Sequence, residues 1–194
     1  MTMRLATIAT AFVALGVSAL AIPPVPRKSP EFAIIEASGK QTLLTTLKGK
    51  VVVFALMYTT CPHCQREAVM LTKLQAEMGP RGLQVIGTTF DDSNPAKVAS
   101  FVKQFGIGFP VGYSSADTVM SFLGLSVMDR YVVPQVAVID KKGMIRAQSE
   151  ATGTPNLQDE GYLRTLIESL LKEGPTTTTS DAKKAPATVA KKAN

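Results

Sequence analysis

Residues 51–64, with the sequence VVVFALMYTTCPHC, contain both cysteines and the only histidine of this 194-residue chain. The apolar, β-branched run at its start predicts a buried strand, which the polar residues 58–60 bring to an end. Residues 65–74 follow with apolar side chains at helical spacing and no helix breaker. Pro62 suits the first turn of that helix, because its missing N–H would be unpaired there in any case. The two cysteines are therefore expected where a strand passes into a helix.

This position makes Cys61 and Cys64 candidates for redox chemistry. The first turn of a helix exposes unpaired N–H groups and the positive end of the helix dipole, so a thiolate at Cys61 is expected to be stabilised and reactive. Cys64 follows one turn later, close enough to form a disulfide with Cys61. We expect Cys61 to attack a substrate sulfur and Cys64 to resolve the mixed disulfide. So small a loop cannot serve as a structural staple.

The formal net charge of the chain, +6, lies mostly at its two ends. One unit comes from Arg4 and three net units come from residues 174–194, which leaves two for residues 22–173. No face that combines basic and aromatic residues accompanies this charge, so we expect no nucleic-acid partner. The length suits one domain with an extension at each end.

Both ends differ in composition from the central part. Residues 1–21 begin with a positive charge, continue with an apolar run and end in Ala-Leu-Ala, which is typical of a signal peptide; an uncleaved N-terminal anchor is the alternative. Either predicts a periplasmic or other extracytoplasmic location, with membrane contact only if the segment stays uncleaved. Residues 22–30 contain four prolines and are expected to form a linker. Residues 174–194, rich in Thr, Lys, Ala and Pro, are expected to be disordered.

Residues 31–173 alternate between strand and helix patterns and are expected to form the folded domain. We expect strands at 31–37, 51–57, 83–90, 131–140 and 144–150, and helices at 62–78, 95–105, 116–123 and 156–172. Two strand–helix–strand units with right-handed crossovers, followed by a hairpin and a helix, predict an α/β fold. Its centre is expected to be a mixed β-sheet with helices on both faces.

Five short stretches carry a resemblance to known proteins. They are 49–54 (GKVVVF), 61–67 (CPHCQRE), 85–87 (VIG), 109–111 (FPV) and 133–143 (VPQVAVIDKKG). Together they resemble the thioredoxin-like proteins, and more specifically the extracytoplasmic TlpA/ResA-like branch of the redoxin (alkyl hydroperoxide reductase/thiol-specific antioxidant) superfamily. The resemblance, over residues 31–172, implies a thioredoxin-like three-layer sandwich. It also implies thiol-disulfide exchange with client proteins and a redox partner protein, by a monomer without a bound cofactor.

The resemblance assigns roles to residues around the cysteines. Pro134 matches a cis-proline that faces the cysteine pair and shapes the substrate groove; from its spacing alone, an ordinary trans proline of an edge strand is the alternative. Val133, Pro62, Tyr58 and Thr60 are the expected substrate-binding neighbours.

Two residues are candidates for an acid near the active site. Asp92 falls near the place where ResA-like proteins carry an acid close to the active site, with a helix cap as the alternative. Glu67 is the acid of the CPHCQRE stretch.

His63 lies between the two cysteines and is a further candidate catalytic residue. Its side chain can donate to, or lie charged beside, the Cys61 thiolate. That contact would stabilise the reduced form and make the disulfide more oxidising than that of thioredoxin, about −270 mV. The same Cys-Pro-His-Cys string occurs in DsbA-like oxidases, and an exposed histidine without a role is the alternative.

Other cysteine chemistries remain as alternatives. A thiol peroxidase would use Cys61 to attack peroxide, but the peroxiredoxin pattern has Thr three residues earlier, where this chain has Tyr58. A copper-handling thiol module resembling Sco proteins would suit soft thiolates, yet those proteins space their cysteines by three residues and add a distant histidine. A structural zinc site needs about four ligands, so we expect no metal.

Overall fold

Strand β4 (Val51–Met57) runs through the middle of the sheet and is formed by the run that predicted a buried strand. The computed structural model describes residues 23–91, 94–126 and 128–174, so the predicted signal or anchor segment and nearly all of the predicted tail lie outside the described residues. Every residue of β4 is buried. β4 pairs in parallel with β5 (Leu83–Thr89) and antiparallel with β7 (Gln135–Ile139), which makes the sheet mixed, as predicted.

Five further strands complete the sheet in the described part of the chain. They are β1 (Arg27–Lys28), β2 (Ala33–Glu36), β3 (Gln41–Leu43), β6 (Val111–Tyr113) and β8 (Met144–Gln148). The order across the sheet is β1-β8-β7-β4-β5-β6-β2-β3. β5 and β6 pair in parallel, so β4, β5 and β6 end at the same edge.

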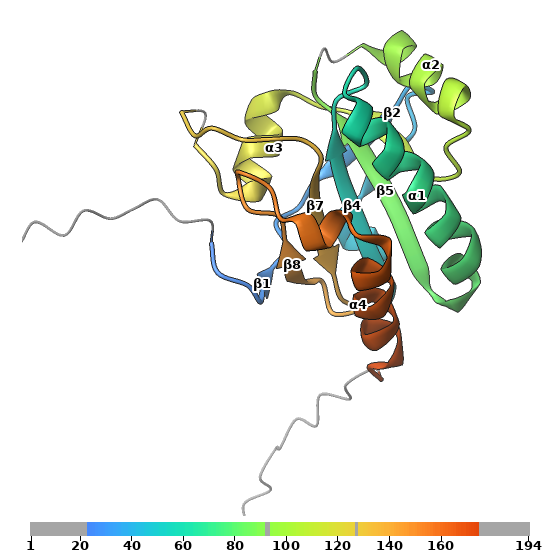
Figure 1. Ribbon diagram of the computed structural model, residues 1–194, viewed down its shortest axis with the longest axis vertical. Coiled ribbons are helices and arrows are strands. Elements are labelled where there is room, and N and C mark those ends of the chain that lie inside the picture. Colours follow the sequence, from blue (N-terminus) through green and yellow to red (C-terminus); the bar gives the residue numbers. More distant parts are fainter. Residues whose placement is uncertain (1–22, 92–93, 127, 175–194) are drawn as a thin grey trace, which may run out of the picture.

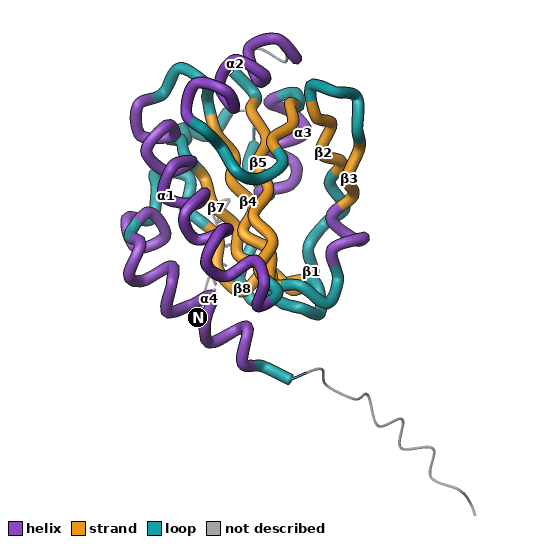
Figure 2. Tube along the Cα trace, turned by 90° about the vertical axis from the view of Figure 1, so that its right-hand side faces the viewer, coloured by secondary structure: helices purple, strands orange, loops and turns teal. Residues whose placement is uncertain are grey.

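The helices lie between the strands in sequence and on both faces of the sheet in space (Figure 1). They are α1 (Pro62–Met78), α2 (Pro95–Phe105), α3 (Ala116–Leu123) and α4 (Glu160–Lys172), with short 3-10 helices η1 (Leu44–Leu47), η2 (Gly79–Arg81) and η3 (Pro155–Gln158). In Figure 2, a second view, α1 lies to the left of β4 and β5 and α3 lies to their right.

Two separate cores hold the layers together, because successive side chains of β4 point to opposite faces. Val53 and Ala55 join the core that packs against α1, α2 and α4. Phe54 and Leu56 join the core on the other face, where α3 packs. There the ring of Phe54 contacts the ring of Phe122 edge-to-face, with 5.1 Å between their centroids. The predicted three-layer α/β arrangement is confirmed.

Three expectations differ from the structure by more than two residues. The strand expected over 131–140 starts only at Gln135, because residues 131–134 form a loop. The helix expected over 156–172 is divided by Asp159, whose side chain accepts the N–H of Tyr162 and so begins a new helix there.

The expected linker, residues 22–30, is the third difference. Its residues Arg27 and Lys28 form β1 and pair with β8. The Arg27 guanidinium also donates to the backbone oxygen of Phe122 at 3.1 Å and to the side chain of Gln148 at 2.6 Å. These hydrogen bonds attach the segment to the sheet, so this part of the chain is not a linker.

No helix among the described residues is long and apolar enough to cross a membrane.

Candidate active site

The cysteine motif lies at the sheet edge where β4 and β5 end. Cys61 is the N-cap residue of α1, with an extended backbone (φ −83°, ψ 119°), and Pro62 takes the first helical position. The Cys61 carbonyl accepts the N–H of Gln65 at 3.0 Å, which is the first bond of the helix. Cys61 therefore precedes the first turn rather than lying inside it, close to the positive end of the helix dipole, and its side chain makes no capping hydrogen bond.

Cys61 faces the loop before β7. Its side chain is half-buried, and its Sγ lies 3.8 Å from the backbone oxygen of Val133, to which the thiol donates. The peptide bond between Val133 and Pro134 is cis, as the resemblance implies. The structure thus brings Cys61 next to the Val133–Pro134 loop, although Cys61 and Val133 lie 72 positions apart in the sequence.

Cys64 has a different environment from Cys61. It is 0% exposed, and its Sγ accepts the backbone N–H of Tyr58 at 3.4 Å. Burial raises the pKa of the Cys64 thiol, and the neighbouring Cys61 and Glu67 raise it further. Both cysteines are free thiols in this structure. The pair therefore consists of one accessible sulfur and one that stays protonated inside the protein.

Glu67 is a buried acid directly behind the cysteine pair. It lies on α1 one turn after Cys64 and is 4% exposed. Burial raises the pKa of Glu67 to about 8, so at neutral pH most of the carboxyl is protonated. Its Oε1 has no hydrogen-bond partner within the described residues. Asp92, the other acid considered from the sequence, lies outside the described residues.

Asp91 is a site residue that sequence reasoning missed. Its Oδ2 accepts both the backbone N–H of Thr59 at 2.6 Å and the Thr59 hydroxyl at 2.7 Å. The Gln65 amide donates to the carbonyl of the same threonine at 3.0 Å, so three hydrogen bonds fix the loop before Cys61. The sequence does contain a signal for Asp91. It follows β5, which is parallel to β4, so it is expected at the same sheet edge as the cysteine motif.

A pair of tyrosines joins the two loops that flank Cys61. The hydroxyls of Tyr58 and Tyr131 lie 2.7 Å apart, and the Tyr58 ring contacts Phe90 with 4.7 Å between centroids. Burial, together with the Tyr131 hydroxyl, raises the pKa of Tyr58. Tyr131 was not foreseen as a site residue. The substrate-binding role expected of Tyr58 stays a prediction, and in the structure its hydroxyl is engaged within the protein.

His63 lies on the surface of α1, beside Arg66. The side chain is exposed, and its Nδ1 lies 3.0 Å from the guanidinium of Arg66. Because a guanidinium only donates hydrogen bonds, Nδ1 accepts and the ring carries its proton on Nε2 in this arrangement. The predicted contact between His63 and the Cys61 sulfur stays a prediction.

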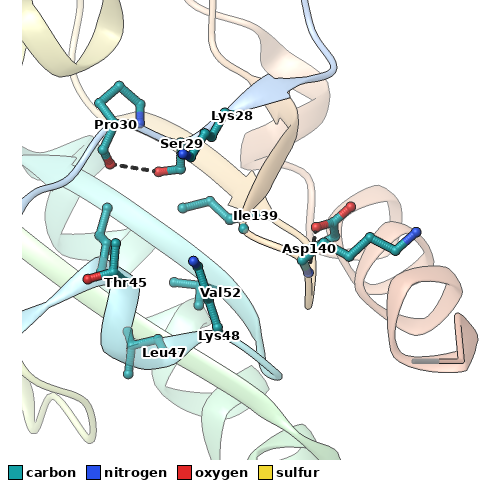
Figure 3. Close-up of a pocket in the computed structure, with 12 residues that line it drawn as sticks. Lys28, Ser29, Pro30, Thr45, Leu47, Lys48, Val52, Ile139 and Asp140 are labelled. Atoms are coloured by element: carbon teal, nitrogen blue, oxygen red, sulfur yellow. Dashed lines mark hydrogen bonds between the residues drawn. The ribbon is translucent and has the colours of Figure 1, made fainter. Parts of the chain in front are cut away.

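A small pocket lies at the opposite end of β4 and is separate from this site (Figure 3). Val52 and Ile139 form its apolar wall, and Lys28 and Lys48 stand beside it. Its volume is about 40 Å³, room for a few waters at most. β4 spans about 20 Å between this pocket and the cysteine motif. Among the described residues, no group of three or more His, Cys, Asp or Glu side chains is placed to hold a metal ion.

Comparisons with known proteins agree with this geometry. ResA of Bacillus thuringiensis (strain Al Hakam), named a thiol-disulfide oxidoreductase, is 29% identical over 138 residues, which cover 71% of this chain and 76% of the relative. ResA of Geobacillus thermodenitrificans is 25% identical over 131 residues, 68% of this chain and 71% of the relative.

Solved structures show the same fold. A putative protein disulfide isomerase from Bacteroides thetaiotaomicron has a TM-score of 0.65 at 25% identity, over 79% of this chain and 94% of that one. A putative thiol:disulfide interchange protein DsbE from Chlorobium tepidum has a TM-score of 0.63 at 23% identity, over 75% and 96%. Residues 24–166 match the Redoxin family. The chain therefore has the predicted thioredoxin-like fold and belongs to the Redoxin family, and its predicted likeness to the ResA-like branch is confirmed.

Proposed function

We propose that the chain is an enzyme that exchanges disulfides with protein thiols, a thiol-disulfide oxidoreductase. The observation that carries this proposal is the asymmetry of the cysteine pair. Cys61 is accessible at the start of α1 and faces the Val133 carbonyl, whereas Cys64 is buried behind it. One sulfur is thus placed to meet a client and the other to meet only Cys61. The names of the ResA relatives support the same activity.

The reaction with a client disulfide takes two displacements. The Cys61 thiolate attacks one client sulfur, the client S–S bond breaks, and the second client sulfur leaves as a thiolate. Cys64 then attacks the Cys61 sulfur, which releases the first client sulfur and leaves a Cys61–Cys64 disulfide. Two electrons pass from the protein dithiol to the client. The same steps in reverse oxidise a client dithiol.

The second displacement requires that Cys64 lose its proton. Burial raises the pKa of the Cys64 thiol, so the proton needs an acceptor inside the protein. Glu67 is electrostatically coupled to Cys64, and its pKa of about 8 lets the carboxyl exchange a proton near neutral pH. Glu67 is therefore proposed as the acid–base partner of Cys64.

The client is proposed to lie against the loop that ends in Pro134. The Val133 carbonyl lies 3.8 Å from the Cys61 sulfur, and the sequence neighbours of Cys61 are Pro62 and the exposed Thr60. The location is proposed to be outside the cytoplasm, on the basis of the signal-like composition of residues 1–21. There disulfides form and are exchanged, which suits a protein that works as a monomer with client and redox-partner proteins.

Trapping tests the mechanism directly. In a Cys64→Ser variant the mixed disulfide on Cys61 cannot be resolved, so reduced variant incubated with disulfide-bonded proteins should accumulate covalent adducts. Non-reducing gel electrophoresis detects the adducts, and they should vanish on addition of a reductant. Cys61→Ser is the matched control and should form none. If Cys64→Ser remains reactive toward an alkylating reagent yet forms no adduct, the proposed reaction is wrong.

A further inference from the structure

The outer face of α1 carries a groove that begins at the cysteine motif. Its lining combines apolar and basic side chains, namely Pro62, Val69, Met70, Phe105, Arg66 and Lys73. The groove has a volume of about 330 Å³, comparable to the sites that hold small ligands. The Val69 side chain is 38% exposed, one of the few large apolar side chains left in solvent. A ligand here would cover apolar surface within one helical turn of the active site.

This face is a second apolar stripe on a helix that already has one. The core-facing stripe of α1 includes Ala68, Leu71 and Leu74, which are buried. Val69 and Met70 follow Arg66 by three and four residues and precede Lys73 by four and three. At this spacing the four side chains share one face of the helix, the outer one. Val69 is exposed, whereas Met70 is half-buried against the core, and Phe105 at the end of α2 also lines the groove.

The face is also positively charged. Within residues 62–76 and 95–105 the only acidic residue is Glu67, which is buried. α2 adds Lys97 and Lys103 and no acid. Clustered charges of one sign at a surface attract a partner of opposite charge and speed its encounter.

Two carboxylates among the described residues near this face are engaged elsewhere. Glu77 follows Lys73 by one turn and senses its charge, but the Glu77 carboxylate forms its ion pair with Arg164 of α4. Asp91 is occupied by the two hydrogen bonds from Thr59. Among the described residues, neither Arg66 nor Lys73 forms an ion pair, so these two charges are available to a partner.

A second groove continues the first toward Cys61. Gln65 lines both, and the second has a volume of about 540 Å³ between Thr59–Thr60 and the Ser100 and Gln104 side of α2. We define the α1–α2 groove as these two grooves together. Thr60 and Pro62, the two sequence neighbours of Cys61, line it, so an extended segment lying in it passes beside the cysteine motif.

We propose that the α1–α2 groove binds a client segment that carries both acidic and apolar side chains next to the exchanged cysteine. This inference rests on the proposed exchange function and names its substrate class. Apolar client side chains cover Val69 and Met70, while carboxylates pair with Arg66 and Lys73. The chain's own C-terminal segment, residues 174–194, is excluded as the occupant because its net charge is +3, the same sign as the groove.

Two synthetic peptides of equal length test the proposal. Each carries one cysteine activated as a disulfide with an aromatic thiol, flanked by Leu and Glu in one peptide and by Leu and Lys in the other. The Cys61 thiolate attacks the peptide sulfur and expels the coloured aromatic thiolate; Cys64 then closes the protein disulfide and releases the peptide thiolate. The protein gives two electrons and the probe disulfide takes them.

The readout is the ratio of the two second-order rate constants on the same reduced protein. At low ionic strength the acidic peptide should react about fivefold faster, and high salt should bring the ratio close to one. Lys73→Glu should lower the ratio severalfold, and Lys73→Gln should lower it less. Lys142→Glu on the β7–β8 turn makes the same change in net charge and should leave the ratio unchanged. A loss of folded protein affects both rates equally and cancels.

Three results would overturn the proposal. Equal rates for both peptides mean that the groove does not select acidic segments. An equal effect of Lys142→Glu and Lys73→Glu assigns the preference to overall charge. The preference for the acidic peptide could instead be lost as the protein concentration rises, while sedimentation detects a dimer; that result assigns the groove to a second copy of the chain. If a small aromatic disulfide without a peptide also fails to react, the exchange function itself has failed instead.

Discussion

Replacing Glu67 by Gln tests whether the carboxyl behind the cysteine pair is protonated. Glu67 is 4% exposed, and burial raises its pKa from 4.5 to about 8. An acid whose pKa is higher in the folded state binds its proton more tightly there than in the unfolded chain. Its contribution to the free energy of unfolding is therefore fully present below about pH 4.5 and is lost as the pH rises through about 8.

The size of this loss follows from the shift. One pKa unit corresponds to about 1.4 kcal/mol, so between about pH 5 and about pH 8 the wild-type protein should lose about 3 kcal/mol through Glu67. Gln has nearly the same shape and does not titrate. The Glu67→Gln variant should therefore gain about 3 kcal/mol of stability relative to the wild type over that range.

Urea unfolding of both proteins at a series of pH values measures the difference. Glu150→Gln, which replaces an exposed glutamate, is the control and should follow the wild-type curve. Curves for Glu67→Gln and wild type that run parallel across the range would refute the reasoning. They would mean that the Glu67 carboxyl keeps an ordinary pKa in the folded protein, so its carboxylate would be a much weaker base toward the Cys64 thiol than the proposed proton transfer requires.

Two further predictions concern the loop and the thiols. Iodoacetamide should modify Cys61 long before Cys64, because Cys64 is 0% exposed and burial raises its pKa; mass spectrometry of digested protein measures this, and equal labelling would contradict the buried position. Asp91→Ala should lower the free energy of unfolding by about 2 kcal/mol and slow the reaction of Cys61, because two donors of Thr59 lose their acceptor. Asp91→Asn should recover part of both effects, and an Asp91→Ala protein as stable as the wild type in urea would show that these bonds add nothing.

The sequence predicts the centre of the molecule well because local and long-range preferences agree there. In residues 51–64 a run of apolar, β-branched residues favours a strand, and Pro62 favours the first position of a helix. The structure has both features where the sequence favours them. The sheet type and the two-sided helix cover follow from the alternation of strands and helices. The cysteine pair therefore falls at the strand–helix junction, as expected.

The partners of the site could not be predicted from local patterns. Tyr131 lies 73 positions from Tyr58, and Asp91 lies 32 positions from Thr59, so only the register of the sheet brings them together. Asp91 stands in a run of turn-forming residues that equally suits a helix cap. The sequence predicts too early a start for the strand that follows Pro134, because the apolar residues 131–133 suit a strand as well as a loop that approaches Cys61.

The short strand β1 has a consequence for how the protein tolerates shortening. Its two residues occupy the outer hydrogen-bonding groups of β8 at Met144 and Ile145. A chain trimmed to begin at residue 31 would leave those backbone groups open to pairing with the edge of another molecule, which is how aggregation of sheets begins. Removal of residues 1–21 alone would keep the cover in place. The boundary chosen for recombinant expression should therefore lie before Arg27.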